Sequence, residues 1–373
     1  MYLWRLMEWG LYTWVGFSLF LCLYYLVIFG RLALYKTSNK AAVPLPPLSV
    51  VICARNEESN LRKNLPAILQ QHYSADFEVI VVDDHSNDGT FDVLRELQLK
   101  YAHLKPRRFL ADKKYGGKKE ALAFGIGLSQ YDHLVFTDAD CQPQDNLWLS
   151  RMASQFSEKK LVLGYGGHYR KVGWVNKLVR WETLQVAAQY MSLALWGKPY
   201  MGVGRNLAYH KQLFAEANGF ESHKHLRSGD DDLFVSQVGQ AGNTAICVDE
   251  SSFTWSEGPS GFAQWWLQKR RHLSTGTFYK RHSQLVLSLY TLSTLTFYEG
   301  VLIGILGYWP LEVWLGVTLV KLTMQLLVFI PLARRFKSAE TLWLFPLWEF
   351  LTTVFLTCVH LQNRFFGNPE RWK

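Results

Sequence analysis

Short apolar runs recur at regular intervals through the middle of the chain, separated by polar and charged stretches. The runs "LSVVICA" (48–54) and "FEVIVVDD" (77–84) are continuously apolar, which is typical of strands buried on both faces of a sheet. A stretch with helical spacing follows each of them, and a third alternation ends in "HLVFTDAD" (133–140). This order predicts a mostly parallel sheet with helices on both of its faces.

The N-terminal end of the chain is apolar throughout. Residues 9–30 carry no charge over roughly the length that a membrane-spanning helix needs. A signal peptide is the weaker interpretation, because the run is long, follows Glu8 and lacks a small-residue cleavage site. We therefore expect an N-terminal transmembrane anchor.

Three more apolar runs lie near the C-terminus. The runs 285–306 and 311–332 are joined by a Trp-Pro turn and predict a helical hairpin. The run 341–361 contains Pro346 and Glu349, so it spans, kinks or lies at the interface. The sequence thus predicts two to three C-terminal transmembrane helices.

Charge and cysteine usage agree with this plan. The net charge of +9 is concentrated next to the expected spans, which places the middle domain in the cytoplasm by the positive-inside rule. No motif in the sequence supports a nucleic-acid partner. The five Cys are scattered without C-x-x-C spacing, which argues against a disulfide framework or zinc site and agrees with a reducing compartment.

Polar side chains follow each strand of the expected sheet. One such residue at a strand end is usually a turn or cap residue, but three polar strand ends converge on one crevice in a parallel sheet. No G-x-G-x-x-G or G-x-x-x-x-G-K-[ST] loop is present to hold phosphate. The carboxylates of Asp138 and Asp140 repel phosphate directly, but they can hold it through Mg²⁺ or Mn²⁺. The sequence therefore predicts a divalent-metal site.

Residues 47–275 resemble the family 2 glycosyltransferases, in particular the membrane-bound type related to cellulose and hyaluronan synthases. The resemblance is carried by "VVICARNEE", "VVDDHSNDGT", "GGKKEALAFG", "TDAD", "SGDDDLFVSQ" and "QKRRH". It implies an α/β fold of the GT-A type, with a Rossmann-like mixed sheet that binds a nucleotide-sugar.

The resemblance also implies roles for individual residues. It places Asp140 on the metal and Asp138 on the metal, ribose and diphosphate. The other nucleotide-sugar-binding residues that it implies are Ala54, Asn56, Glu57, Asp83, Asp84, Lys118, Gln268, Arg271 and His272. Two departures are visible: His272 stands where the family usually has Trp, and Ala54-Arg55 replaces a tyrosine-containing stretch.

The acidic run "GDDDLF" is the expected source of the catalytic base. Matched to the family, Asp231 is the base and Asp230 orients it or contacts the acceptor. Neighbouring carboxylates raise one another's pKa, which suits a base but equally suits a helix N-terminus. With one base and no evident nucleophile, we expect a single displacement that inverts the anomeric centre.

Two further segments each have two interpretations. Gly204, Arg205 and Asn206 lie either in an acceptor-binding loop or in a plain turn before a helix. The segment 259–283 mixes Trp with basic residues, so it is an amphipathic helix on the membrane surface or an ordinary core helix.

The expected organisation has four parts. These are an N-terminal anchor and linker (1–46), a catalytic domain (47–258), the interfacial segment (259–283) and a C-terminal membrane region (284–373). We predict a multi-pass cell-membrane glycosyltransferase that uses a nucleotide-sugar, with UDP preferred, and a lipid-linked or glycan acceptor. A processive polysaccharide synthase and an inactive nucleotide-binding scaffold are the alternatives. The sugar and the oligomeric state stay open.

Overall fold

The computed structural model describes residues 2–36, 44–114 and 117–367, so part of the expected linker lies outside the described residues. The chain divides into two compact units. Of these residues, 2–35, 170–192 and 260–367 form a helical unit, and 36, 44–114, 117–169 and 193–259 form a sheet unit. Each unit is described by itself.

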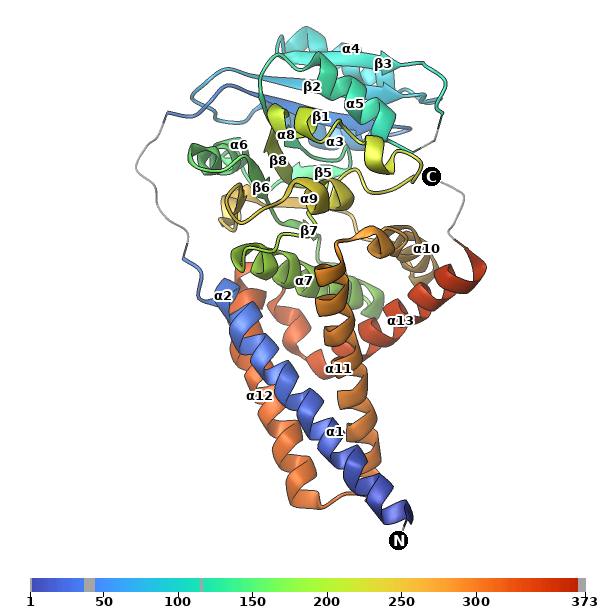
Figure 1. Ribbon diagram of the computed structural model, residues 1–373. Coiled ribbons are helices and arrows are strands. Elements are labelled where there is room, and N and C mark those ends of the chain that lie inside the picture. Colours follow the sequence, from blue (N-terminus) through green and yellow to red (C-terminus); the bar gives the residue numbers. More distant parts are fainter. Residues whose placement is uncertain (1, 37–43, 115–116, 368–373) are drawn as a thin grey trace. The chain divides into compact units, whose positions relative to one another are not determined.

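A seven-stranded sheet organises the sheet unit (Figure 1), with the strand order β3-β2-β1-β4-β8-β6-β9. The pairs β3/β2, β2/β1, β1/β4 and β6/β9 are parallel, whereas β8 is antiparallel to both neighbours. The expected mixed α/β sheet is therefore confirmed. Its strands are β1 (Leu48–Ala54), β2 (Phe77–Asp84), β3 (Leu104–Phe109), β4 (His133–Phe136), β6 (Leu161–Leu163), β8 (Leu207–His210) and β9 (Thr244–Ile246).

Helices cover both faces of this sheet. Alternate β-strand residues such as Val50 and Val79 pack with α3 (Glu58–Leu69), α4 (Thr90–Lys100) and α6 (Trp148–Ala153). On the other face, α5 (Lys119–Leu128) packs so closely that a Cβ at Gly125 would lie 2.9 Å from side chains of β1 and β2. The continuous apolar runs of these strands are explained by this burial on both sides.

A second, three-stranded sheet has the order β5-β10-β7. Its strands are β5 (Cys141–Pro143), β7 (Gly166–His168) and β10 (Thr254–Ser256). Because β5 begins directly after Asp140, this small sheet fixes the chain as it leaves the expected metal motif. The remaining elements of the sheet unit are α8 (Lys211–Glu216), α9 (Asp232–Val238) and three 3₁₀ turns, η2 (Ser154–Ser157), η3 (Glu221–His223) and η4 (Glu250–Ser252).

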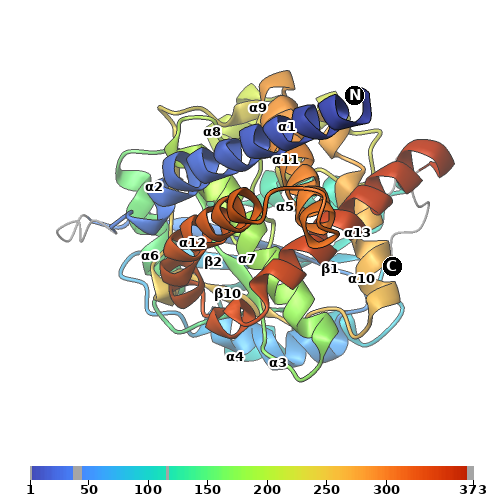
Figure 2. The ribbon, with the colours of Figure 1, turned by 90° about the horizontal axis from the view of Figure 1, so that it is seen from below.

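The helical unit is built from long helices that lie side by side (Figure 2). Its elements are α1 (Tyr2–Tyr24), the π-helical turn η1 (Tyr25–Phe29), α2 (Gly30–Ala33), α7 (Trp174–Leu195), α10 (Phe262–Leu273), η5 (Gly276–Phe278), α11 (Arg281–Ile305), α12 (Leu311–Arg335), η6 (Ala339–Leu342) and α13 (Phe345–Phe366). Among the described residues, three segments are long and apolar enough to cross a membrane: 7–33, 281–305 and 311–335. The run 341–361, whose topology the sequence left open, begins in η6 and continues in α13, and it is not one of the three.

The helix α7 lies within the segment expected to form the catalytic domain, yet most of it belongs to the helical unit. The reason is its packing: the Trp181 ring stacks on Phe329 of α12 with centroids 5.3 Å apart. Gln185 Nε2 also donates a hydrogen bond of 2.9 Å to the Tyr290 hydroxyl of α11. Helix α7 therefore completes the apolar core of the helical unit.

Candidate active site

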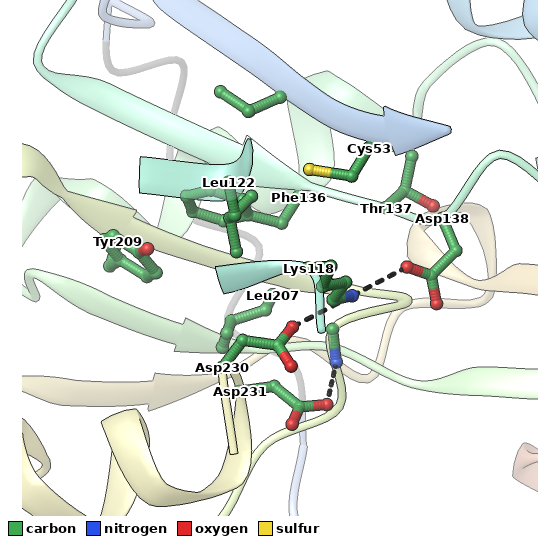
Figure 3. A pocket seen from close by; sticks show the side chains of 12 residues that line it. Cys53, Lys118, Leu122, Phe136, Thr137, Asp138, Leu207, Tyr209, Asp230 and Asp231 are labelled. Atoms are coloured by element: carbon green, nitrogen blue, oxygen red, sulfur yellow. Dashed lines mark hydrogen bonds and ion pairs between the residues drawn. The ribbon is translucent and has the colours of Figure 1, made fainter. Parts of the chain in front are cut away.

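A pocket opens in the sheet unit where β1 and β4 end (Figure 3). Because the two strands are parallel neighbours, the residues that follow them reach the same edge of the sheet. Among the residues expected at the site, the pocket is lined by Lys118, Asp138, Gly204, Asp230 and Asp231. Four separate segments of the chain thus meet in one place.

Lys118 links the expected metal motif to the acidic run. Its Nζ lies 3.0 Å from Asp138 Oδ1 and 2.9 Å from Asp230 Oδ2, as the dashed lines in Figure 3 mark. Burial alone lowers the pKa of a lysine, but the carboxylates of Asp138, Asp230 and Asp231 outweigh it and raise the pKa of Lys118 well above its ordinary value. Lys118 is therefore a fixed positive charge between two acidic groups.

The residues at 138–141 fit a hard divalent cation. Ligand atoms of Asp138, Asp140 and Cys141 all lie within 4.8 Å of one another. Burial raises the pKa of the Cys141 thiol well above its ordinary value. Mg²⁺ and Mn²⁺ are hard cations that favour oxygen over sulfur, so Cys141 is a poor ligand for them. The two carboxylates remain as oxygen ligands, which Mg²⁺ and Mn²⁺ prefer.

Asp231 lies at the N-terminus of α9, facing the loop that contains Gly204. Its Oδ2 accepts a hydrogen bond of 2.7 Å from the Gly204 N–H, and its Oδ1 accepts one of 2.8 Å from the Asp232 N–H. Burial first, and then the charges of Asp230 and Asp232, raise the pKa of Asp231 to about 7, against the lowering effect of Lys118. A carboxylate with this pKa can accept a proton near neutral pH.

The acidic pair at the end of β2 is buried and already paired. One oxygen of Asp84 contacts Lys113 Nζ, and the other lies 3.0 Å from His85 Nδ1. Asp83 accepts a 3.2 Å hydrogen bond from the Ser86 N–H and lies 3.5 Å from Arg108 Nε. Lys113 was missed by the sequence analysis, because nothing in "DKKYGGKK" distinguishes it from its neighbouring lysines.

Asn56 and Glu57 brace the loop after β1 against the loop after β2. The Asn56 N–H donates to Ser86 Oγ at 2.9 Å, and Asn56 Oδ1 accepts from the Asn87 N–H at 2.8 Å. Asn56 adopts a left-handed conformation with φ of 56°, which asparagine tolerates better than most residues. The Glu57 N–H donates to Thr90 Oγ1 at 2.9 Å. Ala54 is buried at the end of β1, paired in register with Asp83.

The three residues expected to bind an acceptor have different surroundings in the structure. Gly204 lines the pocket, and Arg205 Nη1 contacts His168 Nε2 at 3.1 Å and Ser256 Oγ at 3.2 Å. Asn206 is fully buried: its Oδ1 accepts from Trp148 Nε1, and its Nδ2 donates to the Tyr165 and Ser252 carbonyls. The side chain of Asn206 is thus occupied by protein partners, which favours the interpretation of this residue as part of a plain turn.

Gln268, Arg271 and His272 lie on α10, in the helical unit rather than the sheet unit. Helix α10 is held there by polar contacts on two sides. Lys269 Nζ donates to Glu182 Oε1 of α7 at 2.7 Å, and Trp266 Nε1 donates to Gln362 Oε1 of α13 at 2.8 Å. The predicted contact of these three residues with a nucleotide-sugar stays a prediction.

Comparison with known proteins identifies the class. Residues 49–216 match the family model described as "Glycosyl transferase family 2". Residues 49–216 therefore form a family 2 glycosyltransferase domain, as the sequence motifs predicted.

Individual relatives match parts of the chain. It is 26% identical over 233 residues to the probable glycosyltransferase YdaM of Bacillus subtilis, covering 61% of this chain and 54% of that protein. It is 31% identical over 147 residues to the beta-monoglucosyldiacylglycerol synthase of Trichormus variabilis, covering 39% of this chain and 31% of that protein. The chain thus spans about half or less of the length of these curated relatives.

The fold is also found in a solved structure. The mannosyltransferase PcManGT of Pyrobaculum calidifontis, determined in complex with GDP-Man and Mn²⁺, has a TM-score of 0.61 to this chain at 16% identity. The similarity covers 95% of this chain and 100% of that one. The expected fold class is therefore confirmed.

Proposed function

We propose that this protein is an integral-membrane, metal-dependent glycosyltransferase that moves a sugar from a nucleoside-diphosphate sugar to a lipid-linked or membrane-proximal acceptor. The observation that carries the proposal is the meeting of Lys118, Asp138, Asp230 and Asp231 in one pocket. A cation, an expected metal ligand and a carboxylate with a pKa near neutrality suit the transfer of a sugar from a nucleoside diphosphate.

The role proposed for each residue of the site follows from its charge. Asp138 and Asp140 would hold a divalent cation, which supplies positive charge to the departing diphosphate when bound. Lys118 adds a second positive charge on the same side. At the other end, Asp231 takes the proton of the acceptor hydroxyl as its oxygen bonds to the anomeric carbon. The bond from that carbon to the phosphate oxygen breaks, and the nucleoside diphosphate leaves with the electron pair, which inverts the anomeric centre.

Asp84 and Asp83 would receive the nucleobase. Both side chains are buried at the carboxyl end of β2, the position at which ligands bind in open α/β sheets. A uracil N3–H can donate to the Asp84 carboxylate, so we propose a UDP-sugar as the donor. A guanine N1–H offers the same donor, and competition between uridine and guanosine diphosphates distinguishes the two.

We further propose that the sheet unit lies on the cytoplasmic side of a cell membrane. Arg31 lies in the last turn of the first candidate span and Lys36 follows it, and Arg334 and Arg335 end the third. Cytoplasmic ends of membrane helices are enriched in such residues. Protease digestion of sealed vesicles, right side out and inverted, tests this orientation.

The lipid acceptor is supported by the candidate spans and by the relative that is named beta-monoglucosyldiacylglycerol synthase. The test is nucleoside diphosphate release by the detergent-solubilised protein, with a panel of nucleotide-sugars and Mn²⁺ or Mg²⁺. Release that depends on an added membrane lipid extract supports a lipid acceptor and identifies the donor. Absence of both release and metal-dependent nucleotide binding would instead favour an inactive scaffold.

A further inference from the structure

Three consecutive residues at the start of α5 contact the loop that leads into the acidic run. Gly117, with φ of +75°, lies so close that a Cβ there would be 2.4 Å from the Arg227 carbonyl oxygen. Lys118 pairs with Asp230 at 2.9 Å. Lys119 Nζ donates hydrogen bonds of 2.7 Å to the His223 carbonyl and 2.9 Å to the Leu226 carbonyl.

Lys119 has an unusual environment for a lysine. Only 4% of the residue is exposed, and burying an ammonium group is costly unless its donors find acceptors. Burial lowers the pKa of Lys119 to about 8, although Asp230, Asp232 and Asp231 act in the opposite direction. The two carbonyls that accept from its Nζ belong to one turn, so the Lys119 side chain holds the main chain of that turn in place.

The position of that turn constrains the position of the acidic residues that follow it. Leu226 lies four positions before Asp230, and between them Gly229 adopts φ of +102°. A backbone held at Leu226 and turned at Gly229 leaves few positions for the Asp230 carboxylate. The start of α5 therefore contacts this loop at two points: Lys119 binds the turn, and Lys118 binds the Asp230 carboxylate.

We propose that Lys119 is a positioning residue for catalysis, which places the Asp230 and Asp231 carboxylates by anchoring the turn 223–226 to the start of α5. The proposal rests on the glycosyltransferase function above. Lys119 does not line the pocket, so it acts on the reaction only through the acidic loop.

Donor binding depends on other contacts. The nucleobase end of the site is held by the pair between Lys113 and Asp84 and by the bonds of Asn56 to the loop after β2. Loss of the Lys119 bonds should therefore lower kcat while leaving nucleotide affinity nearly unchanged. A misplacement of a catalytic group by about 1 Å typically lowers the rate roughly 100-fold.

The test compares Lys119→Met, Lys119→Arg and Lys211→Met in the full-length protein. Lys211 is the matched control, because its Nζ also donates to a backbone carbonyl, that of Ser129 at 3.0 Å, and it does not line the pocket. We expect Lys119→Met to lower kcat roughly 10- to 100-fold with nucleotide Kd within about 3-fold of the original protein. Lys119→Arg, which keeps charge and donors, should recover part of the loss, and Lys211→Met should keep kcat.

Hydrogen–deuterium exchange gives a second measurement that does not depend on turnover. In Lys119→Met, exchange should rise in residues 223–232 and stay unchanged in α3 and α4. If Lys119→Met does not fold, Lys119→Gln, which keeps an N–H donor, replaces it.

Unchanged kcat in the Lys119 variants, or equal losses of kcat in Lys119→Met and Lys211→Met, would overturn the proposal. If the original protein binds nucleotide but Lys119→Met turns over normally, only this inference fails; if the original protein neither binds nucleotide nor releases it from any donor, the glycosyltransferase function fails with it.

Discussion

Lys321 and Glu349 form an ion pair with N–O separation of 2.6 Å, and both side chains are completely buried in the helical unit. Three further side chains complete the network around Glu349. Tyr25 and Gln325 donate to its Oε1 at 2.7 and 2.8 Å, and the Tyr298 hydroxyl donates to its Oε2 at 2.7 Å. The network therefore joins η1, α11, α12 and α13 at a single carboxylate.

Replacing Glu349 by Ala should destabilise the helical unit more than any change to an exposed charge. The substitution leaves the Lys321 ammonium buried without its counter-ion, which typically costs about 3–5 kcal/mol. Thermal unfolding of the detergent-purified protein measures the loss. The control is the double substitution Lys321→Met with Glu349→Leu, which removes both charges and should cost less. A single variant that is as stable as the double variant would contradict this expectation.

Gly300 permits the close approach of α1 to α11. A Cβ at this position would lie 2.0 Å from Trp14 Cδ1, and Trp14 is itself buried with its Nε1 donating to the Phe297 carbonyl at 3.0 Å. Gly300→Ala should therefore destabilise the unit by about 1–3 kcal/mol through overpacking. Gly316→Ala in α12 is the matched control, because a Cβ there meets nothing within 4 Å. Equal melting temperatures for the two variants would refute the packing argument.

The rate of transfer should rise with pH through about 7. A general base works in its deprotonated form, and the pKa of Asp231 is raised to about 7 by burial and by its acidic neighbours. Below that pH the carboxylate is protonated and cannot accept the acceptor's proton. Initial rates at saturating donor and acceptor, measured between about pH 5.5 and 8.5, give this part of the pH–rate profile.

Asp231→Asn should remove the base and leave the donor site. Loss of a general base typically lowers kcat about 100- to 10,000-fold. Nucleotide affinity, measured by calorimetry, should change little, since Asp231 bonds only to backbone N–H groups of Gly204 and Asp232 in the described contacts. Near-normal transfer by this variant would mean that Asp230 or another group is the base.

Asp140→Ala should abolish the dependence of nucleotide binding on Mn²⁺. The variant removes one of the two carboxylates that we propose hold the cation, and we expect at least about a 10-fold loss of metal affinity. Cys141→Ser is the neighbouring control and should keep metal binding, because Mn²⁺ favours oxygen ligands over sulfur. Electron paramagnetic resonance of free Mn²⁺ measures both variants, and a weakened Cys141→Ser would show that the sulfur is a ligand.

The buried strands were predictable from sequence because burial on both faces leaves continuous apolar runs. Strands β1 and β2 begin and end at the residues that the runs predicted. Strand β3 (Leu104–Phe109) was missed, since it lies at the sheet edge and its sequence "LKPRRF" contains a proline and charged residues that an edge strand tolerates.

The site was only partly predictable for a related reason. Asp138 stands out because it follows a buried apolar strand, and Asp231 stands out because its acidic run resembles the family motif. Lys113 and Lys119 do not, because their roles come from contacts with residues 29 and 104 positions away in the chain. The burial of Asn206 likewise depends on Trp148, Tyr165 and Ser252, which only the folded chain brings together.

The π-helical turn at Tyr25–Phe29 divides the first long helix into two pieces with different rotational phases. Such a turn usually accommodates one extra residue, so side chains beyond it are rotated by about 100° relative to an uninterrupted helix. The piece before the turn is fixed to α11 through Trp14, and the piece after it is fixed to α12 because Arg335 donates to the Leu32 and Tyr35 carbonyls at 2.5 and 2.7 Å. Deleting one residue from the turn would leave only one of the two pieces in register with its partner helix. The length of this helix, and not only its apolar character, is therefore under structural constraint.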